Sequence, residues 1–189
     1  MAEAKRPIVR VPAETRLVVV PYNPEWPAMY DRERAEIDAC IGQHILCIEH
    51  AGGTAIPGMA GKPTVDILVG VHDWDEARVT FGPLAAIGWE FRGERGMPRR
   101  HLFRRLNAQG RRTHQLHMLE VTHPQWEAML LFRDYVRSHP DAAAEYQQLK
   151  LDLARRFPDR RGKYTAGKEA FVMYVLAQAR RAREDGRDA

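Results

Sequence analysis

The chain has 189 residues, of which 44% are hydrophobic and 29% charged, and its formal net charge is +4. This length allows one domain with a proper hydrophobic core, and the composition is that of an ordinary globular protein. No apolar run approaches the roughly 20 residues that span a bilayer, and no signal-peptide core follows the first residues. We therefore expect a cytoplasmic protein that does not enter a membrane.

The positive charge is spread along the chain in small groups rather than concentrated in one run. The groups are Arg99-Arg100, Arg104-Arg105, Arg111-Arg112, Arg155-Arg156 and Arg160-Arg161. Polynucleotide-binding proteins concentrate charge on one face or add stacking aromatic residues, so nucleic acid is the weaker prediction. A few of these arginines would serve an anionic small molecule equally well. The only two cysteines, Cys40 and Cys47, are expected to be small buried thiols rather than a disulfide.

The apolar pattern divides the chain into an α/β part and a helical part. Short β-branched or alternating runs predict strands at residues 16–22, 45–50, 64–71, 88–91, 101–106 and 114–121. Helical spacing predicts helices from Asn23 to Gly42, from Asp73 or Asp75 to about Ile87, from Pro124 to Ser138, from Asp141 to Phe157, and from Lys168 to about Arg183. We predict a mixed sheet of about five strands with flanking helices, in a single domain over residues 16–183. Residues 1–15 and 184–189 are expected to be flexible.

A turn rich in small residues follows the second predicted strand. Gly52 and Gly53 allow backbone N–H groups to approach an anion closely, and Thr54 can donate a hydroxyl. Lys62 stands just before the next strand, where an ammonium group would meet a phosphate. The sequence therefore predicts a phosphate-binding segment here.

Asp66 is the sole charged residue of the strongly apolar strand at residues 64–71. An isolated carboxylate in such a strand is costly without a partner such as a metal ion or an arginine, so we interpret Asp66 as functional. Candidates to complete a site are Glu49, His50, Arg112, His114, His117 and Glu120. Tyr164 and Lys168 are four residues apart, so one helix face could present both to this site. His114 and His117 are three apart, and on a regular strand they face opposite sides of the sheet.

Five ordered motifs resemble the GrpB (UPF0157) family of the nucleotidyltransferase superfamily, over roughly residues 16 to 180. They are VPYNPEWP at residues 20–27, IEHAGGTAIPGMAGKPTVDILV at 48–69, THQLHMLE at 113–120, LFRDYVRSHP at 131–140, and the Tyr-x-x-Leu-Lys and Tyr-Thr-x-x-Lys pieces between Tyr146 and Lys168. The resemblance implies an α/β (α+β) fold with a nucleotidyltransferase-like mixed β-sheet, flanking helices and a C-terminal helical segment.

The chain departs from the family pattern at two points. The family usually has Gly-Ser where this chain has Gly52-Gly53, and the superfamily usually carries Asp-x-Asp where this chain has Thr64 and Asp66. A two-magnesium site needs two or three carboxylates, which this sequence does not obviously supply.

Three functions fit these observations. The first is a transferase that uses Mg²⁺ (or Mn²⁺) to move a nucleotidyl or related group from a nucleoside triphosphate to a small-molecule acceptor. In it, Asp66, His114 and His117 would be catalytic, Gly52, Gly53, Thr54, Lys62 and Arg112 would bind phosphate, and Asp66, Glu49 and Glu120 would hold the metal. The second is a nucleotide- or anion-binding module that has lost the carboxylate pair. The third is an acyl- or amide-transfer enzyme that reuses the pocket.

Overall fold

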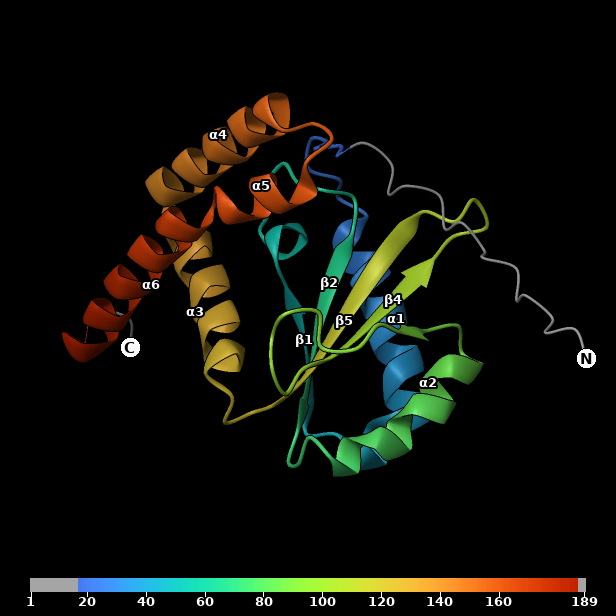
Figure 1. Ribbon diagram of the computed structural model, residues 1–189. Helices are drawn as coiled ribbons and strands as arrows, with labels where there is room; N and C mark the ends of the chain where they lie inside the picture. The colour runs from blue at the N-terminus through green and yellow to red at the C-terminus, as the bar shows by residue number, and fades with distance from the viewer. Residues whose placement is uncertain (1–16, 187–189) are drawn as a thin grey trace, which may run out of the picture.

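The computed structural model of the protein describes residues 17–186, and within them five strands form one mixed sheet (Figure 1). The strands are β1 (Cys47–Ala51), β2 (Val65–Val71), β3 (Glu90–Phe91), β4 (His101–Leu106) and β5 (Arg112–Glu120). Their order across the sheet is β1-β2-β5-β4-β3, with β2 and β5 parallel and the other neighbours antiparallel. The predicted mixed sheet is confirmed.

The two faces of the sheet differ because successive side chains of a strand point to opposite sides. The core face of β2 carries Val65, Ile67 and Val69, which are fully buried. The second face carries Asp66 and Leu68, and the parallel register places Gln115 opposite Asp66 and His117 opposite Leu68. Asp66 and His117 therefore share one face of the sheet, at neighbouring positions of parallel strands.

The core face is covered by α1 (Trp26–Ile41) and by the short helix α2 (Phe81–Ala86), which follows a 3-10 helix at Glu76–Thr80. In Figure 1, α1 lies behind the sheet. Trp26, Ile37 and Ile41 form the buried stripe of α1 at helical spacing and pack on the core face. Gly42 stands at the C-terminal end of α1, as the pattern predicts.

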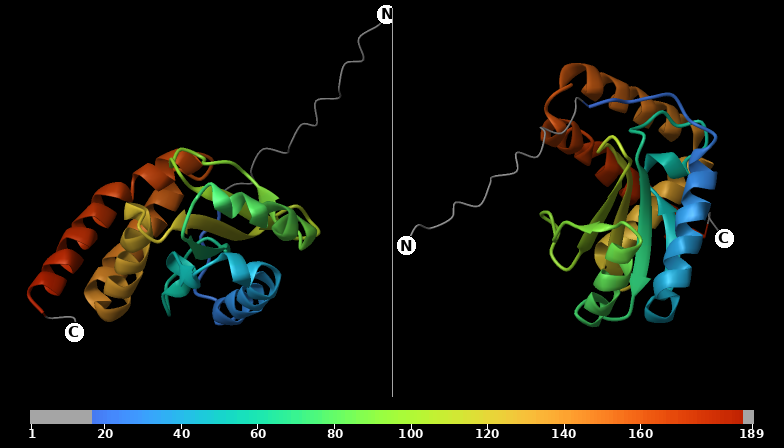
Figure 2. Two further views of the ribbon diagram at one scale, coloured as in Figure 1. Left: turned by 90° about the horizontal axis from the view of Figure 1, so that it is seen from below. Right: turned by 90° about the vertical axis from the view of Figure 1, so that its right-hand side faces the viewer.

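Four helices form the C-terminal part of the protein: α3 (Pro124–Ser138), α4 (Pro140–Arg156), α5 (Arg161–Ala166) and α6 (Glu169–Glu184). Helices α3 and α6 lie side by side in both Figure 1 and Figure 2, joined by a cluster that includes Leu131 and Leu176. A further apolar cluster joins α3, α4 and α6 to the turn that follows β1, through Ile56, Met59, Val136, Tyr146 and Val175. The C-terminal helices are thereby fixed to the small-residue turn.

The structure corrects three details of the predicted elements. Residues 17–22 do not form the predicted strand. They form only an isolated bridge between Val20 and Gly61, because no described segment pairs with them over a greater length. The helix predicted from Asn23 begins instead at Trp26, and Asn23 Oδ1 accepts a hydrogen bond from the Glu25 backbone N–H at 3.0 Å. Helix α5 was not predicted.

Residues 1–16 and 187–189, where most of the predicted flexible termini fall, lie outside the described part of the chain. Helix α6 itself continues to Glu184. Among the described helices, none combines the length and the apolar character that a membrane crossing requires.

Candidate functional site

The glycine turn lies directly against Asp66. Strand β1 ends at Ala51, whose partner on β2 is Asp66, and Gly52 follows with φ 68° and ψ −168°. This backbone region is essentially restricted to glycine. A Cβ at Gly52 would overlap Asp66 Oδ2 and lie 3.1 Å from both Cβ and Cγ of Asp66. Gly52 is therefore required both by the turn and by the closeness of the carboxylate.

Asp66 lies beside His117 on the second face of the sheet. His117 Nε2 is 3.6 Å from Asp66 Oδ1, and the side chain of Asp66 is 28% exposed. Burial alone would raise the pKa of Asp66, but His117, Lys62 and Lys168 together outweigh it, and the pKa lies below its usual range. Asp66 is therefore an ionised carboxylate at neutral pH.

The ring of His117 is held by polar side chains on both sides. Gln115 Nε2 lies 2.9 Å from His117 Nε2, and Gln115 Oε1 accepts a 2.6 Å hydrogen bond from Arg112 Nη1. On the other side, Arg100 Nη1 lies 3.4 Å from His117 Nδ1. Arg112, Gln115, His117 and Asp66 thus form one polar chain across β5 and β2.

Two half-buried lysines stand near Asp66 from different parts of the chain. Lys62 precedes β2 and Lys168 precedes α6, and their Nζ atoms lie 5.7 and 4.9 Å from the ring centre of the buried Tyr164. Burial lowers the pKa of Lys62 to about 8, although the charge of Asp66 opposes the shift. Burial also lowers the pKa of Lys168, again against Asp66. The two ammonium groups therefore share one carboxylate.

Lys150 is a third lysine of this region, and sequence reasoning did not select it. It lies on α4, is only 3% exposed, and donates a hydrogen bond from Nζ to the carbonyl oxygen of Ala60. Burial, reinforced by the charges of Lys168 and Lys62, lowers its pKa to about 7. A sequence signal did exist, because Lys150 falls on the same helical stripe as the buried Tyr146 and Leu153.

Thr54, one of the predicted phosphate contacts, is buried and hydrogen-bonded within the protein. Its Oγ1 lies 3.0 Å from His50 Nε2, and the His50 ring stacks on Tyr30 with 4.6 Å between ring centres. Burial lowers the pKa of His50 to about 4. The Thr54 hydroxyl thus binds a neutral histidine packed against α1.

His114 lies on the core face, away from Asp66. Its Nδ1 is 3.7 Å from Glu33 Oε1 of α1, and its ring meets Trp89 edge-on at 6.3 Å. Burial lowers its pKa to about 4. The two histidines therefore face opposite sides of β5, and His117 alone of the two reaches Asp66.

The structure does not bring the three predicted metal ligands together. Glu49 Oε2 accepts a 2.8 Å hydrogen bond from Arg133, while Glu120 stands at the far end of β5 and accepts one of 2.7 Å from Arg99. Within residues 17–186 no group of three His, Cys, Asp or Glu side chains could hold a metal ion. Mg²⁺ requires several oxygen ligands in octahedral geometry. Asp66 supplies one carboxylate among ammonium groups, so these residues do not fit a magnesium site built by the protein.

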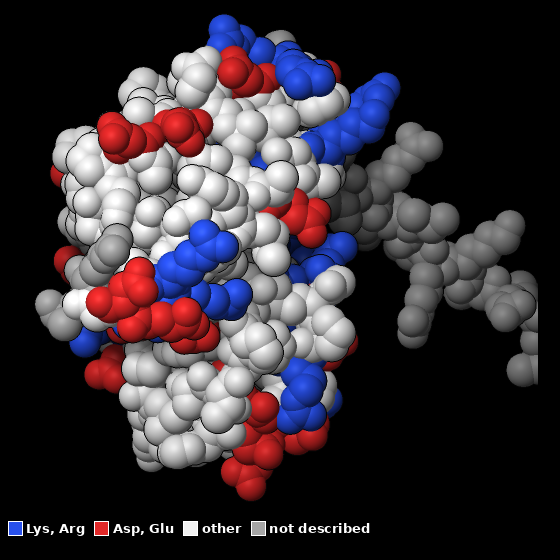
Figure 3. Space-filling view, turned by 90° about the vertical axis from the view of Figure 1, so that its left-hand side faces the viewer, with Lys and Arg blue, Asp and Glu red and all other residues white. Residues whose placement is uncertain are grey.

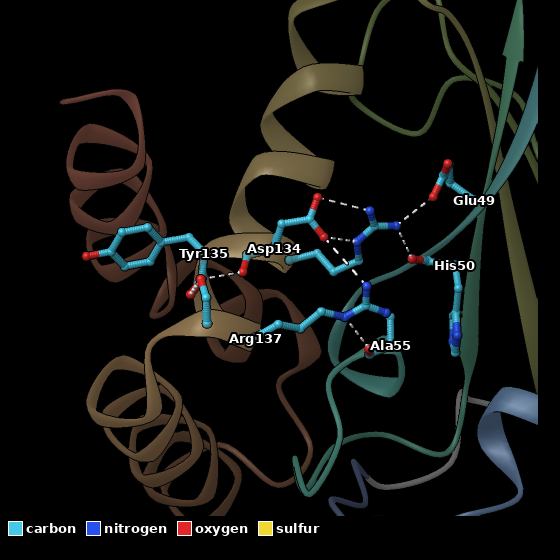
Figure 4. Close-up of polar contacts among 8 residues, drawn as sticks. Glu49, His50, Ala55, Asp134, Tyr135 and Arg137 are labelled. Atoms are coloured by element: carbon cyan, nitrogen blue, oxygen red, sulfur yellow. Dashed lines mark hydrogen bonds and ion pairs between the residues drawn. The ribbon is translucent and has the colours of Figure 1, made fainter. Parts of the chain in front are cut away.

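Arginines of α3 fix the backbone on both sides of the glycine turn (Figure 4). The buried Arg133 donates from Nη1 to the His50 carbonyl at 2.9 Å as well as to Glu49, and Arg137 donates from Nε to the Ala55 carbonyl at 2.8 Å. Asp134 accepts hydrogen bonds of 2.6 and 3.0 Å from Arg133. These contacts position the turn without reaching Asp66.

Surface charge elsewhere is mixed. On the face shown in Figure 3, lysine and arginine side chains lie in small groups beside aspartate and glutamate, and no continuous basic region covers it. The clustered lysines near Asp66 are instead partly buried, where solvent screens their charge less.

A mixed sheet with a glycine turn beside a carboxylate on the adjacent strand defines an α/β protein with a nucleotidyltransferase-like fold. The Cid1 poly(U) polymerase shares this fold, with a TM-score of 0.51 and 15% identity over 73% of this chain and 44% of that one. The chain belongs to the GrpB family, whose model, described as GrpB protein, matches residues 16–178.

Two relatives illustrate the match. The crystal structure of the conserved protein GrpB from Enterococcus faecalis aligns with a TM-score of 0.78 and 31% identity, covering 86% of this chain and 96% of that one. The UPF0157 protein YqkA of Bacillus subtilis is 35% identical over 166 residues, which are 88% of this chain. The chain spans about half of that relative, since the match covers 48% of it.

Proposed function

We propose that the protein binds a phosphorylated nucleotide with its phosphates beside Lys62 and Lys168, against the turn at Gly52 and Gly53. One observation carries the proposal: among the described residues, two half-buried ammonium groups face one carboxylate, that of Asp66. Ammonium groups bind phosphate as point charges, and partial burial strengthens the attraction. The nucleotide is the ligand we infer because the sheet has the nucleotidyltransferase-like fold.

Asp66 has a defined part in such a site. Its ionised carboxylate reduces the repulsion between Lys62 and Lys168 while no ligand is bound. It also offers a hydrogen-bond acceptor to a hydroxyl or amino group of the ligand. Gly52 makes room for the Asp66 carboxylate and Gly53 for the Lys150 ammonium group, so that phosphate oxygens would approach the turn beside these two groups.

A second candidate is transfer of a nucleotidyl group from a nucleoside triphosphate to a small-molecule acceptor, as a metal-dependent reaction. The placement of His117 3.6 Å from Asp66 favours it, since the pair could serve a reacting group on this face of the sheet. We rank it below binding because, among residues 17–186, Asp66 is the one carboxylate beside the lysines and no second acidic ligand joins it in a metal site.

The two functions are separated by titrating ATP, GTP, CTP and UTP by calorimetry, with and without Mg²⁺. We expect binding without Mg²⁺, and at least about tenfold weaker binding in Lys62→Met, since a hydrogen bond to a charged group is worth about 1.5–3 kcal/mol. Lys163→Met is the matched control, because Lys163 is an exposed lysine of α5 outside the cluster.

Asp66→Asn then decides between binding and transfer. Loss of its negative charge leaves metal-free nucleotide binding unchanged or tighter if the protein is a binding module. If Asp66 holds a metal for transfer, the same variant loses Mg²⁺-dependent binding while its melting temperature stays the same. The absence of binding to every nucleotide at millimolar concentration would overturn both functions.

A further inference from the structure

Lys150 is a buried cation that has no described carboxylate as a partner. Its side chain is almost fully buried on α4, and within residues 17–186 the oxygen that it binds is the Ala60 carbonyl. Among the described residues, none of Lys62, Lys150 and Lys168 forms an ion pair with a carboxylate within 4.0 Å. Asp66 acts on Lys62 and Lys168, whereas the charges that act on Lys150 are those two lysines.

Such an arrangement is unfavourable in the free protein. Burial of a charge without a partner costs free energy, and three ammonium groups that repel one another add to that cost. A bound polyanion would remove both contributions at once. The three lysines are far apart in the sequence, and their burial does not stabilise the free protein. A bound anionic ligand therefore explains their placement better than a structural role does.

We propose that Lys62, Lys150 and Lys168 form a subsite for a diphosphate or triphosphate group, and that Lys150 selects such ligands over monophosphates. The inference rests on the proposed function and specifies its ligand class. It assigns Lys150 a role in binding, not in chemistry.

The glycines of the turn let Lys150 lie against the backbone. A Cβ at Gly53 would lie 3.4 Å from Lys150 Nζ, and one at Gly61 would lie 3.9 Å from it. Because neither residue has a side chain, the ammonium group rests directly on the turn. The same turn adjoins Asp66 through Gly52, so a phosphate chain along it would run between the surroundings of Asp66 and Lys150.

Charge matching explains why the third lysine would discriminate. The two charges of Lys62 and Lys168, less the one of Asp66, leave about one net positive charge, which offsets much of the roughly −1.5 to −2 charges of a monophosphate. Each additional phosphate brings more negative charge, and Lys150 is a further buried cation that can neutralise it. We therefore expect Lys150 to contribute little to monophosphate affinity and much to triphosphate affinity.

Ligand binding should also change the protonation of Lys150. Burial and the neighbouring Lys168 and Lys62 hold its pKa at about 7, so part of the population is uncharged at neutral pH. A phosphate chain beside Nζ favours the charged form and raises this pKa. Binding of a polyphosphate at pH 7.5 would then take up more protons than binding of a monophosphate, which would protonate Lys62 further but not Lys150.

The experiment uses inorganic tripolyphosphate, orthophosphate, ATP and AMP as probes, titrated by calorimetry in buffers of different ionisation enthalpy. We expect Lys150→Met to weaken tripolyphosphate and ATP at least tenfold, to leave orthophosphate and AMP within twofold, and to reduce proton uptake to the share that Lys62 contributes. Lys163→Met, on the exposed side of α5, should change none of these values. Equal losses for tripolyphosphate and orthophosphate, or proton uptake with tripolyphosphate that is as large in Lys150→Met as in the unaltered protein, would overturn the proposal.

Two measurements do not depend on how well Lys150→Met folds. The unaltered protein must take up protons with tripolyphosphate between pH 7 and 8, and no uptake there refutes the subsite. Gly53→Ala, which places a methyl group 3.4 Å from Lys150 Nζ, should weaken tripolyphosphate more than orthophosphate.

The outcomes also separate this inference from the proposed function. Suppose that Lys150→Met weakens tripolyphosphate and reduces its proton uptake, but that no nucleotide binds more tightly than tripolyphosphate. The proposal of a nucleotide ligand is then refuted, and the proposal of a polyphosphate subsite stands. If nucleotides bind through Lys62 and ignore Lys150, the subsite fails and nucleotide binding stands.

Discussion

Replacement of Gly52 by alanine tests the central geometry of the site. Gly52 combines φ 68° with ψ −168°, a conformation that costs an L-residue about 1–3 kcal/mol. The added methyl group would also overlap Asp66 Oδ2, so the carboxylate must move from its place beside His117. We expect Gly52→Ala to lower the free energy of unfolding by about 2–4 kcal/mol.

Gly58→Ala is the matched control for this variant. Gly58 also has a positive φ, 75°, but a Cβ there meets no atom within 4 Å. It should therefore show the backbone cost alone, about 1–2 kcal/mol. The difference between the two variants, about 1 kcal/mol or more, measures the collision with Asp66.

Urea denaturation of both variants gives the free energies, and thermal melting provides a check, at roughly 2–4 °C per kcal/mol for a domain of this size. Nucleotide titration of the same samples should show weaker binding for Gly52→Ala only. Equal destabilisation of the two variants, with nucleotide affinity unchanged in both, would refute the close contact between Gly52 and Asp66.

Two further predictions concern the residues that support the site. Burial lowers the pKa of His50 and His114 to about 4, so the unfolded chain takes up protons before the folded protein does as the pH falls. The free energy of unfolding should therefore be highest above about pH 6.5 and should fall by about 2–3 kcal/mol per histidine between pH 6.5 and 4. Denaturation of His114→Gln across this range should show about half the wild-type loss, and an unchanged pH profile would contradict the assignment. Arg133→Met removes the hydrogen bonds to Glu49 and to the His50 carbonyl, so the free energy of unfolding measured in urea should fall by about 2–4 kcal/mol. A change below about 0.5 kcal/mol would show that this arginine does not hold the turn.

The strands that could be predicted are those whose pattern reflects burial. Strand β2 is apolar on both faces except at Asp66, and its predicted span differs from the structure by one residue. Residues 17–22 are equally β-branched, yet they form only a bridge, because a strand also needs a partner of similar length, which the local pattern does not reveal. Helix α5 has six residues, too few to show a helical period.

The same distinction applies to the site. Gly52, Lys62 and Asp66 lie close together in the sequence, so a local pattern could suggest them, and strand alternation placed His114 and His117 on opposite faces. The parts supplied by the helices were harder to predict. The sequence suggested Lys168 only as a residue that a helix face could present to the site, and it did not suggest Lys150. Periodicity shows that a residue lies on the buried side of a helix, but not which residues it contacts there. Glu49 and Glu120 were grouped with Asp66 as metal ligands, whereas the structure pairs each of them with an arginine.

The contact between Lys150 and the Ala60 carbonyl spans 90 positions of the chain, and this separation has a consequence for biosynthesis. As the polypeptide leaves the ribosome, the sheet with Asp66 and the glycine turn is complete well before α4 and the residues leading into α6 emerge. If the proposed subsite binds a polyphosphate, a nascent chain that has paired its five strands would still lack two of the three lysines. Ligand binding would then require that the C-terminal helices have docked, and a phosphate ligand would stabilise the completed fold over partly assembled ones.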